Sequence, residues 1–321
     1  MRHIRLLLSA FITLCLFLTT AGPALARQLD EGQRSALRQE YILANAEFTL
    51  LHEFGHAAFD AFDVPLFSRE EEAADTVATV LMILNYNVQN RPSGVDRLLM
   101  VSEEWYQEWE TRGRVTALKP YWDEHPLSIE RFYNINCLAL GSNEDLLSLS
   151  LDTKLLPVER GWFCDEEFAR AKRAVEWLYH QHRREPGDKG RALRPPMLTI
   201  QYDKPVGAEN RRVYEILRNS HLFERITDRF DRLMDWPFPI TVAVQNCGGS
   251  PDAFYKAQVH TIFICLDLLV DFGKLADRRA AEGFDEICAN PAIARVMSDQ
   301  LGCDSAVSGG DSPKNGVRSS R

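Results

Sequence analysis

The sequence predicts an α+β fold that is mostly helical, with a small sheet supplied by the C-terminal half. Apolar residues recur at helical spacing through the first half of the chain, and the pattern changes to strand-like alternation after a polar stretch rich in Gly and Pro. The length of 321 residues suits one large or two modest domains. We predict a helical metal-binding half at 27–184, a connector at 185–197, an α/β half at 198–304 and a disordered tail at 305–321.

The first 26 residues are typical of a secretory signal peptide. Arg2 and Arg5 precede an apolar run that begins at Leu6, and residues 24–26 (Ala-Leu-Ala) form a small-residue cleavage site. A membrane anchor is the alternative, but the apolar run is short and ends close to a Gly-Pro pair. We therefore expect cleavage after Ala26, a periplasmic or extracellular location and no stable membrane anchor in the mature chain.

The mature chain is acidic and retains an even number of cysteines. Cleavage removes two of the 37 basic residues and none of the 46 acidic ones, which leaves a formal charge of −11 and argues against nucleic-acid binding. Six cysteines remain once Cys15 is removed, with no CxxC pair, and an exported chain of this kind favours disulfides. The sequence does not choose the connectivity, and our hypothesis pairs nearest neighbours: Cys137 with Cys164, Cys247 with Cys265, and Cys288 with Cys303.

Five helices are predicted in the first half and no strand. The first runs from about residue 36 to 62, and the others span 68–87, 95–113, 127–141 and 166–183, with Ser68 as the cap of the second. In the second half, strands are predicted at 197–202, 240–246 and 259–265, and helices at 210–234 and 266–282. Alternation continues back from the third strand to Ala253, as in one partly exposed strand.

Residues 48–62, FTLLHEFGHAAFDAF, place the pattern HExxH in the first predicted helix. His52 and His56 lie four residues apart, so they project from one helical face and can meet one ion. Glu53 lies about 100° further round the helix, where it can act as general base on a metal-activated water without being a ligand. Gly55 permits another backbone to come close. The alternative is that the two histidines are only hydrogen-bonded beside a core. A third metal ligand nearby would favour the metal site.

The stretch FSREEEAADTVA offers that third ligand. Glu71 and Asp75 lie four residues apart on the second predicted helix, so the glutamate can bind metal while the aspartate orients a ligand histidine. A capping box between Ser68 and Glu71 is the competing interpretation. Glu72 would then be the ligand, with Glu70 a more distant choice. We favour Glu71 because it leaves Asp75 in register.

The segment HPLSIERFY can complete such a site. Hydrolysis at a metal usually needs a donor that stabilises the oxyanion, and His125, Arg131 and Tyr133 are available. Arg131 and Tyr133 could equally be structural, and His125 could cap a helix; we select His125 and Tyr133 as candidate catalytic residues. Four other histidines show no ligand-like spacing: His180, His182, His221 and His260.

In these segments the chain resembles a family of secreted bacterial zinc metallopeptidases long classed as a domain of unknown function. The resemblance is carried by NAEFTLLHEFGHAAFDAFDVPLFSREEEAADTVAT, DEHPLSIERFYNINCLALGS, LPVERGWFCDEEFARA and WPFPITVAVQNCGGSPDAFYKAQVHTIFICLDLLVDF. Together they span most of residues 43–272. The resemblance implies a zincin-like fold, a Zn²⁺ cofactor and a peptide or protein substrate.

The favoured function is an exported zinc-dependent metallohydrolase, which we expect to be a peptidase with Glu53 as general base. The alternative from another class is a catalytically silent metal-binding scaffold or envelope-binding protein, which would be free to lose Glu53. A zinc-storage or chaperone role would predict further His-rich or acidic runs, which the sequence lacks. Zinc hydrolases of this type usually hold substrate along a sheet edge. We therefore expect the C-terminal strands to fold back onto the HExxH helix as one catalytic unit.

Overall fold

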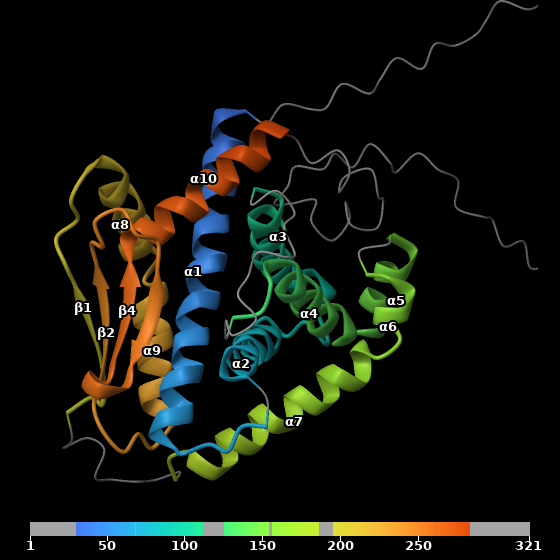
Figure 1. Ribbon diagram of the computed structural model, residues 1–321, viewed down its shortest axis with the longest axis horizontal. Helices are drawn as coiled ribbons and strands as arrows, with labels where there is room; N and C mark the ends of the chain where they lie inside the picture. The colour runs from blue at the N-terminus through green and yellow to red at the C-terminus, as the bar shows by residue number, and fades with distance from the viewer. Residues whose placement is uncertain (1–29, 68, 112–124, 154–155, 186–194, 283–321) are drawn as a thin grey trace, which may run out of the picture.

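The computed structural model describes residues 30–67, 69–111, 125–153, 156–185 and 195–282. Within them the chain is mostly helical and has one four-stranded mixed sheet in the C-terminal half, which confirms the predicted α+β class (Figure 1). The expected signal peptide, the tail, most of the connector, Ser68, Cys15, Cys288 and Cys303 lie outside the described residues.

The elements follow one another as a helical half and then an α/β half. The first half contains α1 (Glu31–Ala61), α2 (Glu70–Asn85), η1 (Pro92–Val95), α3 (Asp96–Thr111), α4 (Ser128–Gly141), α5 (Glu144–Thr153), α6 (Val158–Gly161) and α7 (Cys164–His182). The second half contains β1 (Leu198–Tyr202), α8 (Ala208–Ser220), α9 (Leu222–Leu233), β2 (Ile240–Gln245), β3 (Ala253–Lys256), η3 (Ala257–Val259), β4 (Thr261–Cys265) and α10 (Leu266–Glu282). Among the described helices, none is both long and apolar enough to cross a membrane.

Helix α1 is the central element of the molecule. It begins earlier than predicted because Asp30 and Gln33 form a capping box, in which each side chain bonds the other's main-chain N–H. On one side α1 contacts α2 and α3, and on the other it contacts α8, α9, α10, β3 and β4 (Figure 1). Eighteen of its residues are buried, over all of its faces.

The other predicted helices of the first half are present, and α5 and α6 were not predicted. Helix α2 differs from prediction at its start. The residue at its N-cap is Arg69, whose side chain makes no capping hydrogen bond. Ser68, the predicted cap and the partner of Glu71 in the competing capping box, lies outside the described residues. Glu71 lies in the first turn of α2, with its side chain directed to α1.

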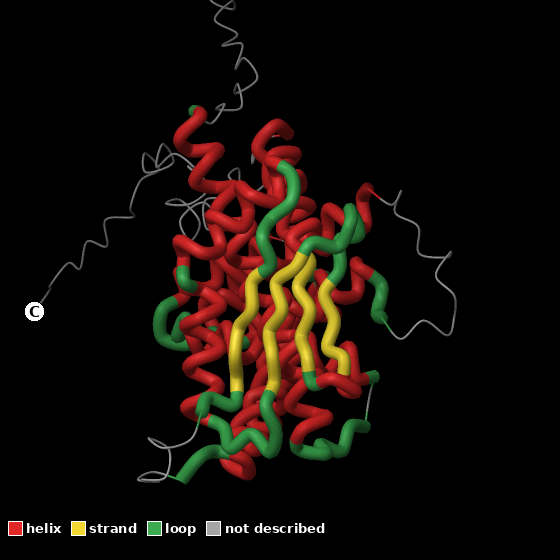
Figure 2. Tube along the Cα trace, turned by 90° about the vertical axis from the view of Figure 1, so that its left-hand side faces the viewer, coloured by secondary structure: helices red, strands yellow, loops and turns green. Residues whose placement is uncertain are grey.

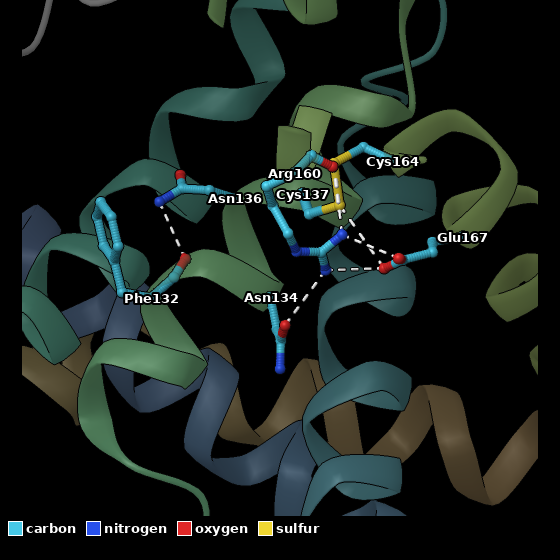
Figure 3. The surroundings of a disulfide bond; sticks show 7 residues. All are labelled: Phe132, Asn134, Asn136, Cys137, Arg160, Cys164 and Glu167. Carbon is cyan, nitrogen blue, oxygen red and sulfur yellow. Dashed lines mark hydrogen bonds and ion pairs between the residues drawn. A yellow bond between two sulfur atoms is a disulfide. The ribbon is translucent and has the colours of Figure 1, made fainter. Parts of the chain in front are cut away.

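Helices α4 and α7 meet at a disulfide. Cys137 bonds Cys164 with their Cα atoms 4.9 Å apart, and Arg160 binds the carboxylate of Glu167 beside them (Figure 3). A Cβ atom at Gly141 would lie 2.3 Å from the carbonyl oxygen of Cys164. Glycine is therefore required where the two helices approach, and the pairing matches the nearest-neighbour hypothesis.

The sheet has the strand order β1-β2-β4-β3. The pairs β1–β2 and β2–β4 are parallel, and β3 runs antiparallel to β4 as a free edge strand. Alternate residues of β2 are buried, starting with Ile240. This alternation fits a sheet that packs on helices with one face, and Figure 2 shows those helices behind the strands.

Two predictions for the second half are wrong in detail. The single helix expected at 210–234 is two helices, because His221 adopts a left-handed conformation (φ 51°) between α8 and α9. The single strand expected from Ala253 to Cys265 is the hairpin β3–β4. Its turn ends at His260, which is also left-handed (φ 47°).

A second disulfide holds the loop that leads into β3. Cys247 bonds Cys265 at the end of β4, again as the nearest-neighbour hypothesis pairs them. The Asp267 carboxylate accepts from the main-chain N–H groups of Cys247 and Gly249 at 2.9 and 3.1 Å. Gly249 has a φ of 92°, which favours glycine. The edge strand is thus anchored at its start by covalent and main-chain bonds.

Because α1 packs on both halves, we expect residues 27–184 to be unstable as a fragment. Phe54 stacks on Phe230 of α9 with ring centroids 4.9 Å apart, and truncation after Arg184 removes this partner. Each such side chain contributes roughly 1.5–3 kcal/mol when fully buried. Thermal unfolding followed by circular dichroism should show no cooperative transition in the fragment and a clear one in the chain from residue 27 to 321. A fragment that folds cooperatively and binds zinc would contradict the single-unit prediction.

Candidate metal centre

Two facing helices bring the candidate ligands together. The HExxH residues lie in α1, and the acidic run of α2 packs across from them. Gly55 permits this approach, since a Cβ atom there would lie 3.2 Å from the Cα atom of Ala74. The helix–helix distance at the site is therefore set by a glycine within the HExxH pattern.

His52, His56 and Glu71 converge on one point. The Nε2 atoms of the two histidines are 3.0 Å apart, and the Glu71 carboxylate lies 3.3 Å from one and 3.6 Å from the other. The donor atoms of all three lie within 4.8 Å of one another, so the group could hold a metal ion. Glu71 Oε2 is buried and faces His52 Nε2 at 3.3 Å. A metal between these atoms would bind both of them, so the residues fit the ion.

Each histidine is bonded through its other nitrogen to a carboxylate. His52 Nδ1 lies 2.9 Å from Asp75 Oδ1, and His56 Nδ1 lies 2.8 Å from Glu70 Oε1. An ionised carboxylate can only accept, so both Nδ1 atoms carry a proton, and Nε2 is the nitrogen of each ring that is left to bind a metal. This is the tautomer that metal-ligating histidines adopt.

Burial and charge perturb the acid–base behaviour of the group. Burial disfavours a charged His52, but the hydrogen bonds to Asp75 and Glu71 outweigh it and raise its pKa to about 9. The pKa of Asp75 is lowered, since the Arg131 charge overcomes the effect of burial. The pKa of Glu71 is also lowered against burial, by its hydrogen bond to His52 and by the neighbouring histidines. Both carboxylates are thereby kept ionised.

Glu53 is buried beside the three donors, with 4 % of its surface exposed. Burial raises the pKa of its carboxyl to about 7, and the nearby carboxylates of Glu71 and Asp252 add to the rise. A hydrogen bond from the main chain of Tyr255 in β3 acts in the opposite direction. Glu53 Oε2 has no hydrogen-bond partner within the described ranges. A buried carboxyl with a free oxygen and a near-neutral pKa can take up and release a proton.

The remaining candidates lie at different distances from this centre. His125 approaches it, with Nε2 3.3 Å from Glu71 Oε1 and its side chain 59 % exposed. Tyr133 and Glu72 line a neighbouring cavity of about 570 Å³ together with Arg69, Pro126, Glu130 and Asn134. Glu72 forms an ion pair with Arg69 at this cavity, whereas Glu71 contacts both histidines.

Two contacts of the site differ from what the sequence predicts. Glu70, the more distant choice of third ligand, bonds His56 Nδ1 through its carboxylate. Arg131, a candidate oxyanion donor, is buried and bonds both oxygens of Asp75. Helical spacing could have suggested the first contact, because Glu70 and Asp75 flank Glu71 on the same helix. The second joins two helices, and no local pattern encodes it.

A partly buried His-His-Glu group beside a glutamate with a free oxygen is typical of metal-dependent hydrolases. The chain belongs to the family described as "Putative metallopeptidase", which it matches over residues 9–179 and 202–298. No curated protein and no solved structure matches it. The family and the site thus agree on a metallopeptidase, with peptides or proteins as the substrate class.

Glu71 and Glu72 offer a matched test of the ligand set. Glu71→Gln keeps the shape of the side chain but removes the charge that faces His52 and His56. Substitution of a residue that only supports a metal ligand typically lowers metal affinity about tenfold or more, so we expect loss of the Glu71 charge to lower zinc affinity by at least tenfold. Glu72→Gln is the control and should bind as the wild type does. Competition with a chromophoric chelator measures both. Equal affinities, or loss confined to Glu72→Gln, would exclude Glu71 as the ligand.

Proposed function

We propose that the protein is an exported zinc-dependent peptidase in which His52, His56 and Glu71 hold Zn²⁺ and Glu53 is the general base. One observation carries the proposal: the Nε2 atoms of two histidines and the Glu71 carboxylate converge beside Glu53, whose Oε2 atom has no hydrogen-bond partner among the described residues. Two imidazoles and one carboxylate are a donor set found in catalytic zinc sites, which keep one position open. Bound there, zinc would supply Lewis acidity and lower the pKa of a water molecule.

Residues of the chain would orient the two histidines and transfer the proton. Asp75 and Glu70 hold the two imidazoles in the tautomer that leaves Nε2 free. Glu53 would accept a proton from the attacking water and pass it to the leaving amine, a role that its near-neutral pKa suits.

His125 is the better candidate for stabilising the oxyanion. Its Nε2 atom lies within 3.3 Å of Glu71 and its side chain is largely exposed, so it can turn toward a bound substrate. Tyr133 lines the neighbouring cavity and no contact joins it to the three donors among those the structure describes. Its catalytic role is therefore the weaker part of the proposal.

The edge strand β3 supports binding of an extended peptide. Asp252 O accepts from Cys265 N, and hydrogen-bonded pairs alternate along an antiparallel ladder. The main-chain groups of Ala253 and Tyr255 therefore point away from β4. The N–H of Ala253 donates to Asp252 Oδ1 and that of Tyr255 to Glu53, which leaves their carbonyl oxygens to accept from a peptide. Pairing with these carbonyl groups would hold a peptide over the site with little dependence on its side chains.

Export is supported by the two disulfides, since such bonds persist in oxidising compartments. The amino-terminal signal remains a sequence prediction. Together they favour a periplasmic or extracellular peptidase.

Glu53→Gln tests the catalytic proposal directly. Glutamine keeps the shape but cannot take a proton, so we expect unchanged zinc content, about one ion per chain, and a kcat on a mixed peptide library at least ~100-fold lower. Glu47→Gln is the control, because Glu47 is equally buried in α1 but bonds Arg97 and Tyr86 instead. Equal kcat in Glu53→Gln and wild type would remove Glu53 from the mechanism and favour the scaffold function.

The edge-strand proposal predicts a substrate effect. Methylation of one backbone nitrogen in a peptide that is cleaved should raise KM when that nitrogen pairs with β3, because a main-chain hydrogen bond is lost. Scanning the methyl group along the peptide should give alternating positions of large and small effect. Replacement of side chains at the same positions is the control. A uniform response to methylation would argue against strand pairing.

A further inference from the structure

We propose that Arg131 is a positioning residue that fixes the Asp75 carboxylate, and through it His52, and so sets the metal affinity of the site. The inference rests on the proposed function only in that a metal binds at His52, His56 and Glu71. It assigns Arg131 a role distinct from the oxyanion contact considered from the sequence.

The geometry forms a chain of contacts from α4 to the metal-binding nitrogen. Arg131 Nε donates to Asp75 Oδ2 at 2.7 Å, and an NH2 group of the same guanidinium donates to Asp75 Oδ1. Asp75 Oδ1 is also the atom that accepts from His52 Nδ1 at 2.9 Å. One carboxylate therefore joins the guanidinium to the imidazole, and a carboxylate bound at both oxygens cannot rotate.

Arg131 is itself held in place on its other side. Its guanidinium carbon lies 3.9 Å from the ring centroid of Trp105 in α3, and the residue is 7 % exposed. The guanidinium also lies 3.5 Å from His52 Nδ1. Both of those groups are donors, so this approach is packing rather than a hydrogen bond. Buried between Trp105 and Asp75, Arg131 has no path to a substrate.

The positive charge of Arg131 compensates the buried negative charge of Asp75. A carboxylate as buried as Asp75 is costly without a bound cation, and removal of one partner leaves an uncompensated charge. Without Arg131 the Asp75 carboxylate would lose the contacts that fix both of its oxygens, and it would hold His52 less firmly. Glu70, which bonds His56, is exposed to solvent and has no such requirement. The two histidines are thus held by different means.

The test uses Arg131→Lys in the full mature chain. Lysine keeps the charge but replaces the two-point contact with a single one, so we expect the Kd for Zn²⁺ to rise about tenfold, as typical for changes behind a ligand histidine. The control is Arg97→Lys. Arg97 is partly buried, bonds Glu47 of α1 and lies over the Tyr86 ring, and among the described residues its contacts do not include the three metal donors. We expect it to lower Tm while leaving the Kd unchanged.

A double-mutant cycle separates positioning from general destabilisation. Asp75→Asn alone should weaken zinc binding, and Asp75→Asn combined with Arg131→Gln should bind no more weakly, because Arg131 acts through Asp75. The double variant also carries no unpaired buried charge, so it remains measurable where Arg131→Lys fails to fold. Additive losses in the cycle, or equal Kd values for wild type and Arg131→Lys, would overturn the inference while leaving zinc binding intact. A wild type that binds no zinc would instead overturn the proposed function, and the inference with it.

Discussion

Burial of α1 on both sides is the constraint on which the rest of the structure depends. A helix that contacts helices on one side and a sheet on the other must be apolar nearly all round, and α1 buries residues from Leu37 to Phe59. Polar side chains on such a helix must find partners within the protein. The HExxH residues meet this requirement with α2 on one side and β3 on the other, so the reactive groups are defined by elements from both halves of the chain.

Two buried glutamates on α1 meet the requirement in different ways. Glu47 accepts hydrogen bonds from Tyr86 and Arg97, so its charge is compensated and it joins three helices. Glu53, less than two turns later, is equally buried but keeps one oxygen without a partner among the described residues, and burial raises its pKa to about 7. A protein gains no stability from the second arrangement. The contrast between these glutamates separates a compensated structural charge from a carboxyl with a free oxygen and a near-neutral pKa.

Much of this could be predicted from the sequence, because local periodicity encodes it. The helical first half and the three predicted strands after residue 197 follow from spacing within single elements. Spacing also predicts that the HExxH histidines share one face of their helix and that Glu71 and Asp75 share one face of theirs. The boundaries of two elements were predicted wrongly, in each case where a single left-handed residue ends one element before the next begins. His221 and His260 both adopt left-handed conformations that nothing in the apolar pattern signals, so a helix and a strand were each predicted as continuous. The role of Arg131 was equally hidden, since Asp75 lies 56 residues before it.

Contacts with α1 fix the position of the edge strand β3. Tyr255 reaches α1 twice, with its hydroxyl donating to Asp60 at 2.8 Å and its main chain bonding Glu53. Asp60 lies one turn beyond His56, so the strand is aligned along the helix across the reactive residues. The loop that precedes β3 is fixed by Cys247, Cys265 and Asp267. The groups that would bind a peptide are therefore held at a set distance from the group that would activate water. That distance is controlled by the C-terminal half, although every candidate ligand of the metal lies in the N-terminal half.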